Sequence, residues 1–80
     1  MKIHMKEIVH SYYKLATDEA TILVQLNPET FEGLELIILP DGQIQKTPRV
    51  LDEDIYEDLK ADGFIESGAL EFQLYLSKLK

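Results

Sequence analysis

The sequence predicts an α+β domain: a four- or five-stranded, mainly antiparallel sheet with one helix, about residues 53–61, packed on a face. Three observations predict this class. Residues 35–46 have the pattern of a β-hairpin, residues 52–64 carry helix start and stop signals, and residues 69–77 alternate between apolar and polar side chains. The chain has 80 residues without an internal repeat or a linker, so we expect a single globular domain over residues 1–80.

The first third of the chain is expected to supply two strands. Residues 5–16 place apolar side chains at helical spacing, but residues 9–13 are poor helix formers, so we favour a strand and keep a helix as the alternative. Residues 17–19 would form the turn into the second strand. In residues 20–26, Ile22, Val24 and Leu26 share one face, and a helix capped by Thr17 is the competing interpretation.

A short turn and a hairpin should follow. Asn27 and Pro28 predict a helical turn that runs to Gly33. Residues 34–39 become apolar on both faces, which is typical of a strand covered on both sides. Pro40 and Gly42 favour a tight turn that places Ile38 opposite Ile44. The return strand is polar, so we expect it at the sheet edge, where Pro48 would end its ladder.

The helix of residues 53–61 has signals at both ends. Asp52 is the expected N-cap, and Leu51 and Tyr56 have the spacing of a hydrophobic staple. Gly63 can take the left-handed conformation that ends a helix, which would let Phe64 pack on Leu59. The buried stripe would consist of Ile55, Tyr56 and Leu59.

The alternation in residues 69–77 predicts a strand with one buried face, formed by Leu70, Phe72, Leu74 and Leu76. We expect this face to meet the helix on the same side of the sheet as two other apolar groups of residues. These groups are Ile22, Val24 and Leu26 in one strand, and Leu36, Ile38 and Ile44 in the hairpin.

Composition restricts the classes of partner. The net charge is −7, from 15 acidic and 8 basic residues, which argues against binding to nucleic acid or to an anionic membrane surface. The longest aliphatic run, residues 36–39, is far too short for a membrane span, so no membrane insertion is expected. The chain has no cysteine, which favours a reducing compartment and therefore the cytoplasm.

Reactive groups form no recognisable motif. His4 and His10 lie six residues apart, and neither this spacing nor the Asp52, Asp54 and Asp58 series matches a metal-binding motif. Serines and glycines occur singly, without a nucleophile elbow or a phosphate-binding loop. We therefore expect no catalytic residue, no metal site and no cofactor.

The sequence favours a small acidic accessory module that binds a protein partner, one with a basic surface. The expected contact residues are four acids of the helix and two tyrosines: Glu53, Asp54, Glu57, Asp58, Tyr13 and Tyr75. One alternative is a small dimeric enzyme or ligand-binding protein with an interface site that uses His10, Asp58 and Tyr56. A further alternative is an acidic inhibitor of a basic or nucleic-acid-binding protein. A homodimer is compatible with each of these hypotheses.

Overall fold

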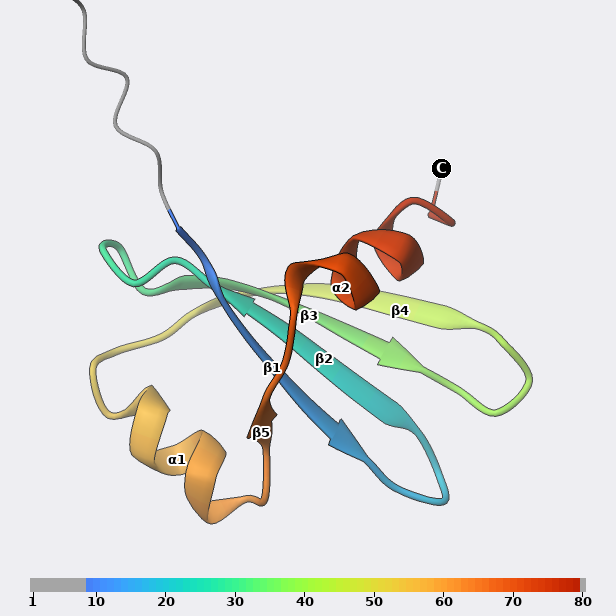
Figure 1. The fold of residues 1–80 in the computed structure, drawn as a ribbon, viewed down its shortest axis with the longest axis horizontal. Helices are drawn as coiled ribbons and strands as arrows, with labels where there is room; N and C mark the ends of the chain where they lie inside the picture. The colour runs from blue at the N-terminus through green and yellow to red at the C-terminus, as the bar shows by residue number, and fades with distance from the viewer. Residues whose placement is uncertain (1–8, 80) are drawn as a thin grey trace, which may run out of the picture.

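The computed structural model describes residues 9–79 and has the expected α+β architecture. Its sheet has five antiparallel strands in the order β4-β3-β2-β1-β5, and two helices accompany it (Figure 1). The strands are β1 (Ser11–Ala16), β2 (Thr21–Leu26), β3 (Glu32–Ile38), β4 (Ile44–Val50) and β5 (Ile65–Glu66). The helices are α1 (Ile55–Ala61) and α2 (Ala69–Leu76).

The first two strands confirm the preferred interpretation of the N-terminal third. β1 and β2 pair from Ser11 opposite Leu26 to Ala16 opposite Thr21. Thr17 closes the turn between them, because its hydroxyl oxygen accepts hydrogen bonds from the backbone N–H groups of Glu19 and Ala20. Residues 5–8, which the sequence assigned to the first strand, lie outside the described residues, as does His4.

The β3–β4 hairpin has the predicted register, with Ile38 opposite Ile44. Pro40 and Asp41 occupy its turn, and Gly42 takes a φ of 93°, which favours glycine over residues with a Cβ. β4 is an edge strand, as predicted, but Pro48 lies inside it rather than at its end. In an antiparallel pair, only every second residue of a strand exchanges hydrogen bonds with the neighbouring strand. The bond from Leu51 N–H to the Phe31 carbonyl shows that these are the odd-numbered residues of β4. The nitrogen of Pro48 therefore points away from β3, and no ladder bond is lost.

Two smaller boundary predictions were wrong. The turn after Asn27 does not run to Gly33, because Phe31 takes a positive φ of 63° and reverses the chain, so that β3 begins at Glu32. The first helix starts at Ile55, two residues later than predicted, and Asp54 precedes it without a side-chain cap bond. The Asp52 carboxylate accepts a hydrogen bond from the Asp54 backbone N–H (3.0 Å), so Asp52 makes the predicted capping bond in the turn that leads into the helix.

The predicted strand over residues 69–77 is the helix α2, and this is the main correction to the fold. Apolar side chains at positions 72, 75, 76 and 79 have helical spacing, and they pack against the sheet, whereas Leu70 and Leu74 are 74% and 55% exposed. Leu, Glu, Gln and Ala are also better helix formers than strand formers. The fifth strand is β5, which the sequence did not indicate.

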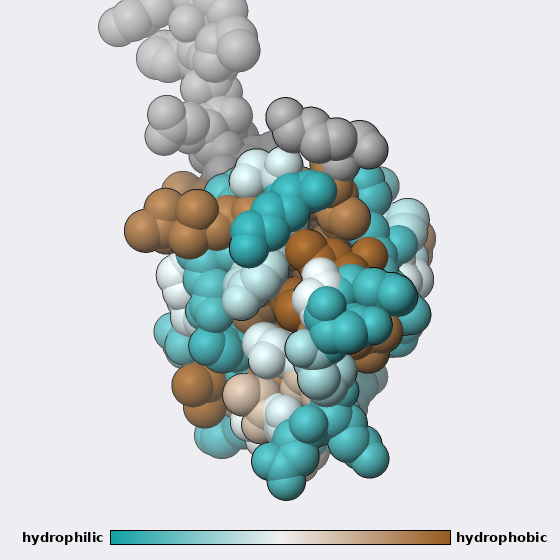
Figure 2. Space-filling model, turned by 90° about the vertical axis from the view of Figure 1, so that its right-hand side faces the viewer, coloured by the Kyte–Doolittle hydropathy of each residue, from teal (hydrophilic) through white to brown (hydrophobic). Residues whose placement is uncertain are grey.

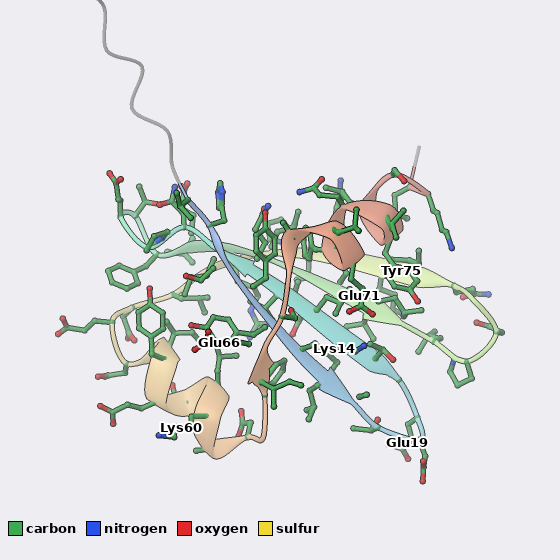
Figure 3. All side chains as sticks on the ribbon, in the orientation of Figure 1. Lys14, Glu19, Lys60, Glu66, Glu71 and Tyr75 are labelled. Atoms are coloured by element: carbon green, nitrogen blue, oxygen red, sulfur yellow. The ribbon has the colours of Figure 1, made fainter. Side chains whose placement is uncertain are left out.

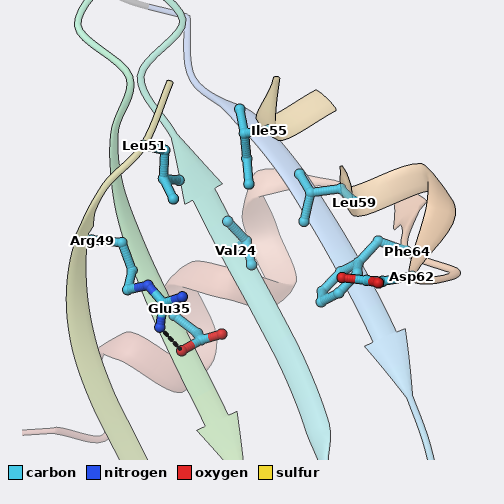
Figure 4. A pocket seen from close by; sticks show the side chains of 8 residues that line it. All are labelled: Val24, Glu35, Arg49, Leu51, Ile55, Leu59, Asp62 and Phe64. Carbon is cyan, nitrogen blue, oxygen red and sulfur yellow. Dashed lines mark hydrogen bonds and ion pairs between the residues drawn. The ribbon is translucent and has the colours of Figure 1, made fainter. Parts of the chain in front are cut away.

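The core is divided between the two faces of the sheet. On one face, Phe72 of α2 packs with Leu23 and Leu36, and all three are at most 1% exposed. On the other face, Leu59 of α1 and Val24 line a common cavity (Figure 4). This arrangement corrects the expected grouping, because the β2–β3 register places Leu36 opposite Leu23, so Leu36 and Val24 lie on opposite faces.

Candidate functional site

The four acidic residues expected to contact a partner lie exposed where α1 begins: Glu53, Asp54, Glu57 and Asp58. Their position at the positive end of the helix dipole also stabilises the short helix. Residues 52–62 contain six acids and one base, Lys60, so this part of the surface carries a negative charge. The acids therefore have a structural role whether or not a partner binds them.

The two tyrosines expected beside these acids lie on opposite faces of the sheet. Tyr13 is half-buried and faces α1, and its ring centroid lies 6.4 Å from that of Tyr56. Tyr75 belongs to α2, packs against the core cluster of the other face and carries the Lys78 ammonium 5.1 Å from its ring centroid. The structure therefore brings Tyr13, but not Tyr75, to the acidic helix.

An open hollow of about 590 Å³ lies between β1, β5 and α1. Its lining, which we call the aromatic hollow, consists of Tyr13, Tyr56, Lys60, Phe64, Ile65 and Glu66. Figure 3 shows Glu66 between the ribbons of β1 and α1, with Lys60 on the far side of α1. The hollow thus combines aromatic walls with one carboxylate, and Lys60 contributes to its lining from α1.

The end of α1 creates this hollow. Gly63 has a φ of 94°, and the Phe64 N–H donates to the Leu59 carbonyl (2.9 Å), as in the predicted Schellman ending. The chain then returns along β1, where Ile65 lies opposite Lys14 and Glu66 lies opposite Tyr13. Ile65 lines the outer border of the hollow and is 64% exposed, but its pairing with Lys14 places its side chain on the opposite side of β5 from Glu66.

The Tyr13 hydroxyl lies among other oxygen atoms. Burial is the largest cause that raises the pKa of Tyr13, and the neighbouring Tyr56 and Glu66 raise it further, while a hydrogen bond with Ser11 lowers it. Tyr13 therefore stays protonated at neutral pH. Its hydroxyl can then donate a hydrogen bond as well as accept one.

A second, smaller cavity of about 120 Å³ lies beneath α1 (Figure 4). Val24, Leu51, Ile55, Leu59 and Phe64 supply its apolar walls. Its charged members are Asp62 and a pair in which the Arg49 guanidinium donates to the Glu35 carboxylate at 3.5 Å. This cavity is too small for a ligand of ordinary metabolite size.

The three residues of the alternative enzyme hypothesis lie in different surroundings. His10 lies beside Tyr12, with ring centroids 6.4 Å apart. Tyr56 instead contacts Tyr13 and Phe31 on the face of the sheet opposite Tyr12, and Asp58 is exposed on α1. Across residues 9–79, no three His, Cys, Asp or Glu side chains are grouped so that they could hold a metal ion.

Sequence reasoning missed most of the aromatic hollow. The sequence places Tyr56 on the buried stripe of the helix and Phe64 against Leu59, and it predicts no element for Ile65 and Glu66. The signal that could have found them was the Schellman ending itself. A helix that ends at Gly63 and is followed by the β-formers Phe64 and Ile65 favours an extended segment there, although it does not specify the strand with which this segment pairs.

Comparison with known proteins finds no matching family model, no similar curated protein and no similar solved structure. Within the described part of the chain, neither helix has the length and apolar character that a membrane crossing requires. The geometry of the site is therefore the basis for a functional proposal.

Proposed function

We propose that this protein is a small accessory module that binds a protein partner through α1 and the aromatic hollow, without catalysis of its own. The observation that carries the proposal is the aromatic hollow itself, an open recess with the rings of Tyr13, Tyr56 and Phe64 in its lining. Since the chain has no cysteine, we expect this interaction to take place in a reducing compartment, the cytoplasm.

The composition of this surface resembles that of the centre of a protein interface. Tyrosine and phenylalanine side chains are enriched there, since they contribute large contact areas at a low cost in conformational entropy. Tyr13 and Tyr56 hold each other in an edge-to-face arrangement, so they lose little freedom when a partner binds. The exposed acids of α1 add negative charge to the helix that carries Tyr56, which would increase the association rate of a basic partner.

The proposal can be tested by cross-linking and affinity capture from the native cell, with Ile65→Lys compared against Leu70→Lys. Both substitutions place an ammonium group at an exposed apolar position, but Ile65 borders the aromatic hollow and Leu70 belongs to α2. We expect a stoichiometric partner to be captured by the wild type and by Leu70→Lys, and to be lost with Ile65→Lys, because the added ammonium group repels a basic partner at the hollow. A partner that both variants retain would contradict the proposed surface.

The contribution of charge needs a separate comparison. Replacing Glu57 and Asp58 by Gln and Asn should slow association and reduce its dependence on salt concentration. The matched control replaces Asp18 and Glu19 in the β1–β2 turn, which removes the same charge from an exposed site away from α1 (Figure 3). Equal effects of the two double variants would show that only the net charge matters.

A further inference from the structure

The aromatic hollow also indicates which chemical group of a partner it would receive. We propose that it binds a cationic side chain, Lys or Arg, through the rings of Tyr13 and Tyr56 and the carboxylate of Glu66. This inference rests on the proposed function, since it identifies the partner group that enters the same surface.

The first argument is the combination of ring faces in the walls. Tyr13 and Tyr56 meet at an interplanar angle of 64°, so the two rings present differently oriented surfaces, and Phe64 supplies a third ring. A cation within about 6 Å of such a ring is attracted by the negative potential of its face. Several rings at an angle to one another form the kind of site that holds an ammonium or guanidinium group.

The second argument is charge. Glu66 lies opposite Tyr13 in the β1–β5 pair, so the backbone fixes a carboxylate beside the ring. Among residues 9–79 the ion pairs are Lys14 with Glu71 and Arg49 with Glu35, and neither of them uses Glu66. A partner's cation would thus meet a carboxylate that no described cation neutralises, on a chain whose net charge is −7.

Lys60 is the group that opposes this binding. It also lines the aromatic hollow and is exposed, so its ammonium group can move into solvent at little cost. While it stays near the rings, it competes with a partner's cation for them and repels it. The proposal therefore predicts that removing the charge of Lys60 strengthens binding, whereas removing the charge of Glu66 weakens it.

The probes for a test are N-acetyl-arginine N-methylamide and its neutral isostere, N-acetyl-citrulline N-methylamide. Each is titrated into the isotopically labelled full chain, and the backbone amide shifts are followed by NMR. We expect the arginine probe to shift Tyr13, Tyr56 and Glu66 saturably, and the citrulline probe to bind about threefold to tenfold more weakly. Equal affinities, or no saturable shift at these residues with the arginine probe, would overturn the proposal.

Three variants complete the test. Glu66→Gln should weaken the arginine probe about threefold to tenfold, Lys60→Gln should strengthen it, and Glu19→Gln should leave it nearly unchanged. Glu19 is the matched control because it is exposed and lies in the β1–β2 turn (Figure 3). Equal weakening by Glu66→Gln and Glu19→Gln would reduce the effect to net charge and refute the site. If instead Ile65→Lys abolishes partner capture while the arginine probe does not bind, the docking surface stands and only the cationic occupant is wrong.

Discussion

Alanine substitutions in α2 can separate the helix from the strand that the sequence suggested. In a strand, Leu70 and Phe72 would point to the same face and would be buried alike. In the structure, Phe72 is 1% exposed and Leu70 is 74% exposed. The two side chains should therefore differ strongly in their contribution to the free energy of unfolding.

The contacts of Phe72 set the size of the effect. Its ring lies 5.5 Å from that of Tyr12, between centroids, and it belongs to the buried cluster with Leu23 and Leu36. Phe72→Ala should lower the free energy of unfolding by about 3–5 kcal/mol, the usual cost of removing a buried aromatic ring. Leu70→Ala should change it by about 0.5 kcal/mol or less, as at other exposed positions.

Urea denaturation followed by circular dichroism measures both free energies. An 80-residue domain at about 0.05–0.15 kcal/mol per residue has a total stability of about 4–12 kcal/mol, so Phe72→Ala can unfold the protein. Phe72→Leu, with an expected cost of about 1–2 kcal/mol, keeps the comparison measurable in that case. If Leu70→Ala destabilised the protein as much as the Phe72 variants, the placement of α2 would be refuted.

Three further predictions concern single positions. Tyr13→Phe should reduce the loss of stability at alkaline pH. Burial raises the pKa of Tyr13 in the folded protein, so the contribution of the protonated side chain to the free energy of unfolding is complete below the unfolded pKa of about 10. This contribution is lost as the pH rises through the folded pKa. Thermal melts from pH 8 to 11 test this, and parallel curves for the two proteins would contradict it. Gly63→Ala should lower the free energy of unfolding by about 1 kcal/mol, because a φ of 94° is unfavourable for a residue with a Cβ. Steric overlap adds nothing, since the nearest atom to an added Cβ, on Leu15, is 3.7 Å away. An unchanged free energy of unfolding in urea denaturation would count against this backbone conformation. Pro48→Thr should promote self-association in light scattering, since it restores an outward N–H on the edge strand β4, and a variant that stays as monodisperse as the wild type would argue that another feature protects this edge.

The surface on the side of the β3–β4 hairpin is mixed rather than uniformly apolar. Figure 2 shows brown hydrophobic groups interrupted by teal hydrophilic ones. Within the described chain, the strongly exposed apolar side chains are Val9, Val50, Ile65, Leu70 and Leu74. Of these, Ile65 borders the aromatic hollow, which is why it gives the most informative substitution for partner binding.

Local sequence signals predicted the elements whose geometry depends on a few neighbouring residues. The β3–β4 hairpin follows from Pro40 and Gly42, which preset the backbone angles of the turn and so its register. The ending of α1 follows from Gly63, because glycine adopts a positive φ without strain. In these cases the same residues supply both the signal and the structure.

The sequence did not determine the conformation of residues 69–77, because alternation and helical spacing overlap in a nine-residue segment. Leu70, Phe72, Leu74 and Leu76 satisfy the strand pattern, while Phe72 and Leu76 together with Tyr75 and Leu79 satisfy the helical one. Packing against the sheet decided between the strand and the helix. The helix buries Phe72 against Leu23 and Leu36 and leaves Leu70 in solvent.

The sequence by itself determined an acidic α+β domain, the β3–β4 hairpin and the ending of α1, since each of these depends on composition or on local backbone preferences. Only the tertiary structure decided which face each strand residue occupies and which residues line the aromatic hollow. Tyr13, Tyr56 and Glu66 are far apart in the chain, and they meet because β5 pairs with β1 after α1 has ended. Long-range pairing of this kind depends on the packing of the whole sheet, and no local pattern encodes it.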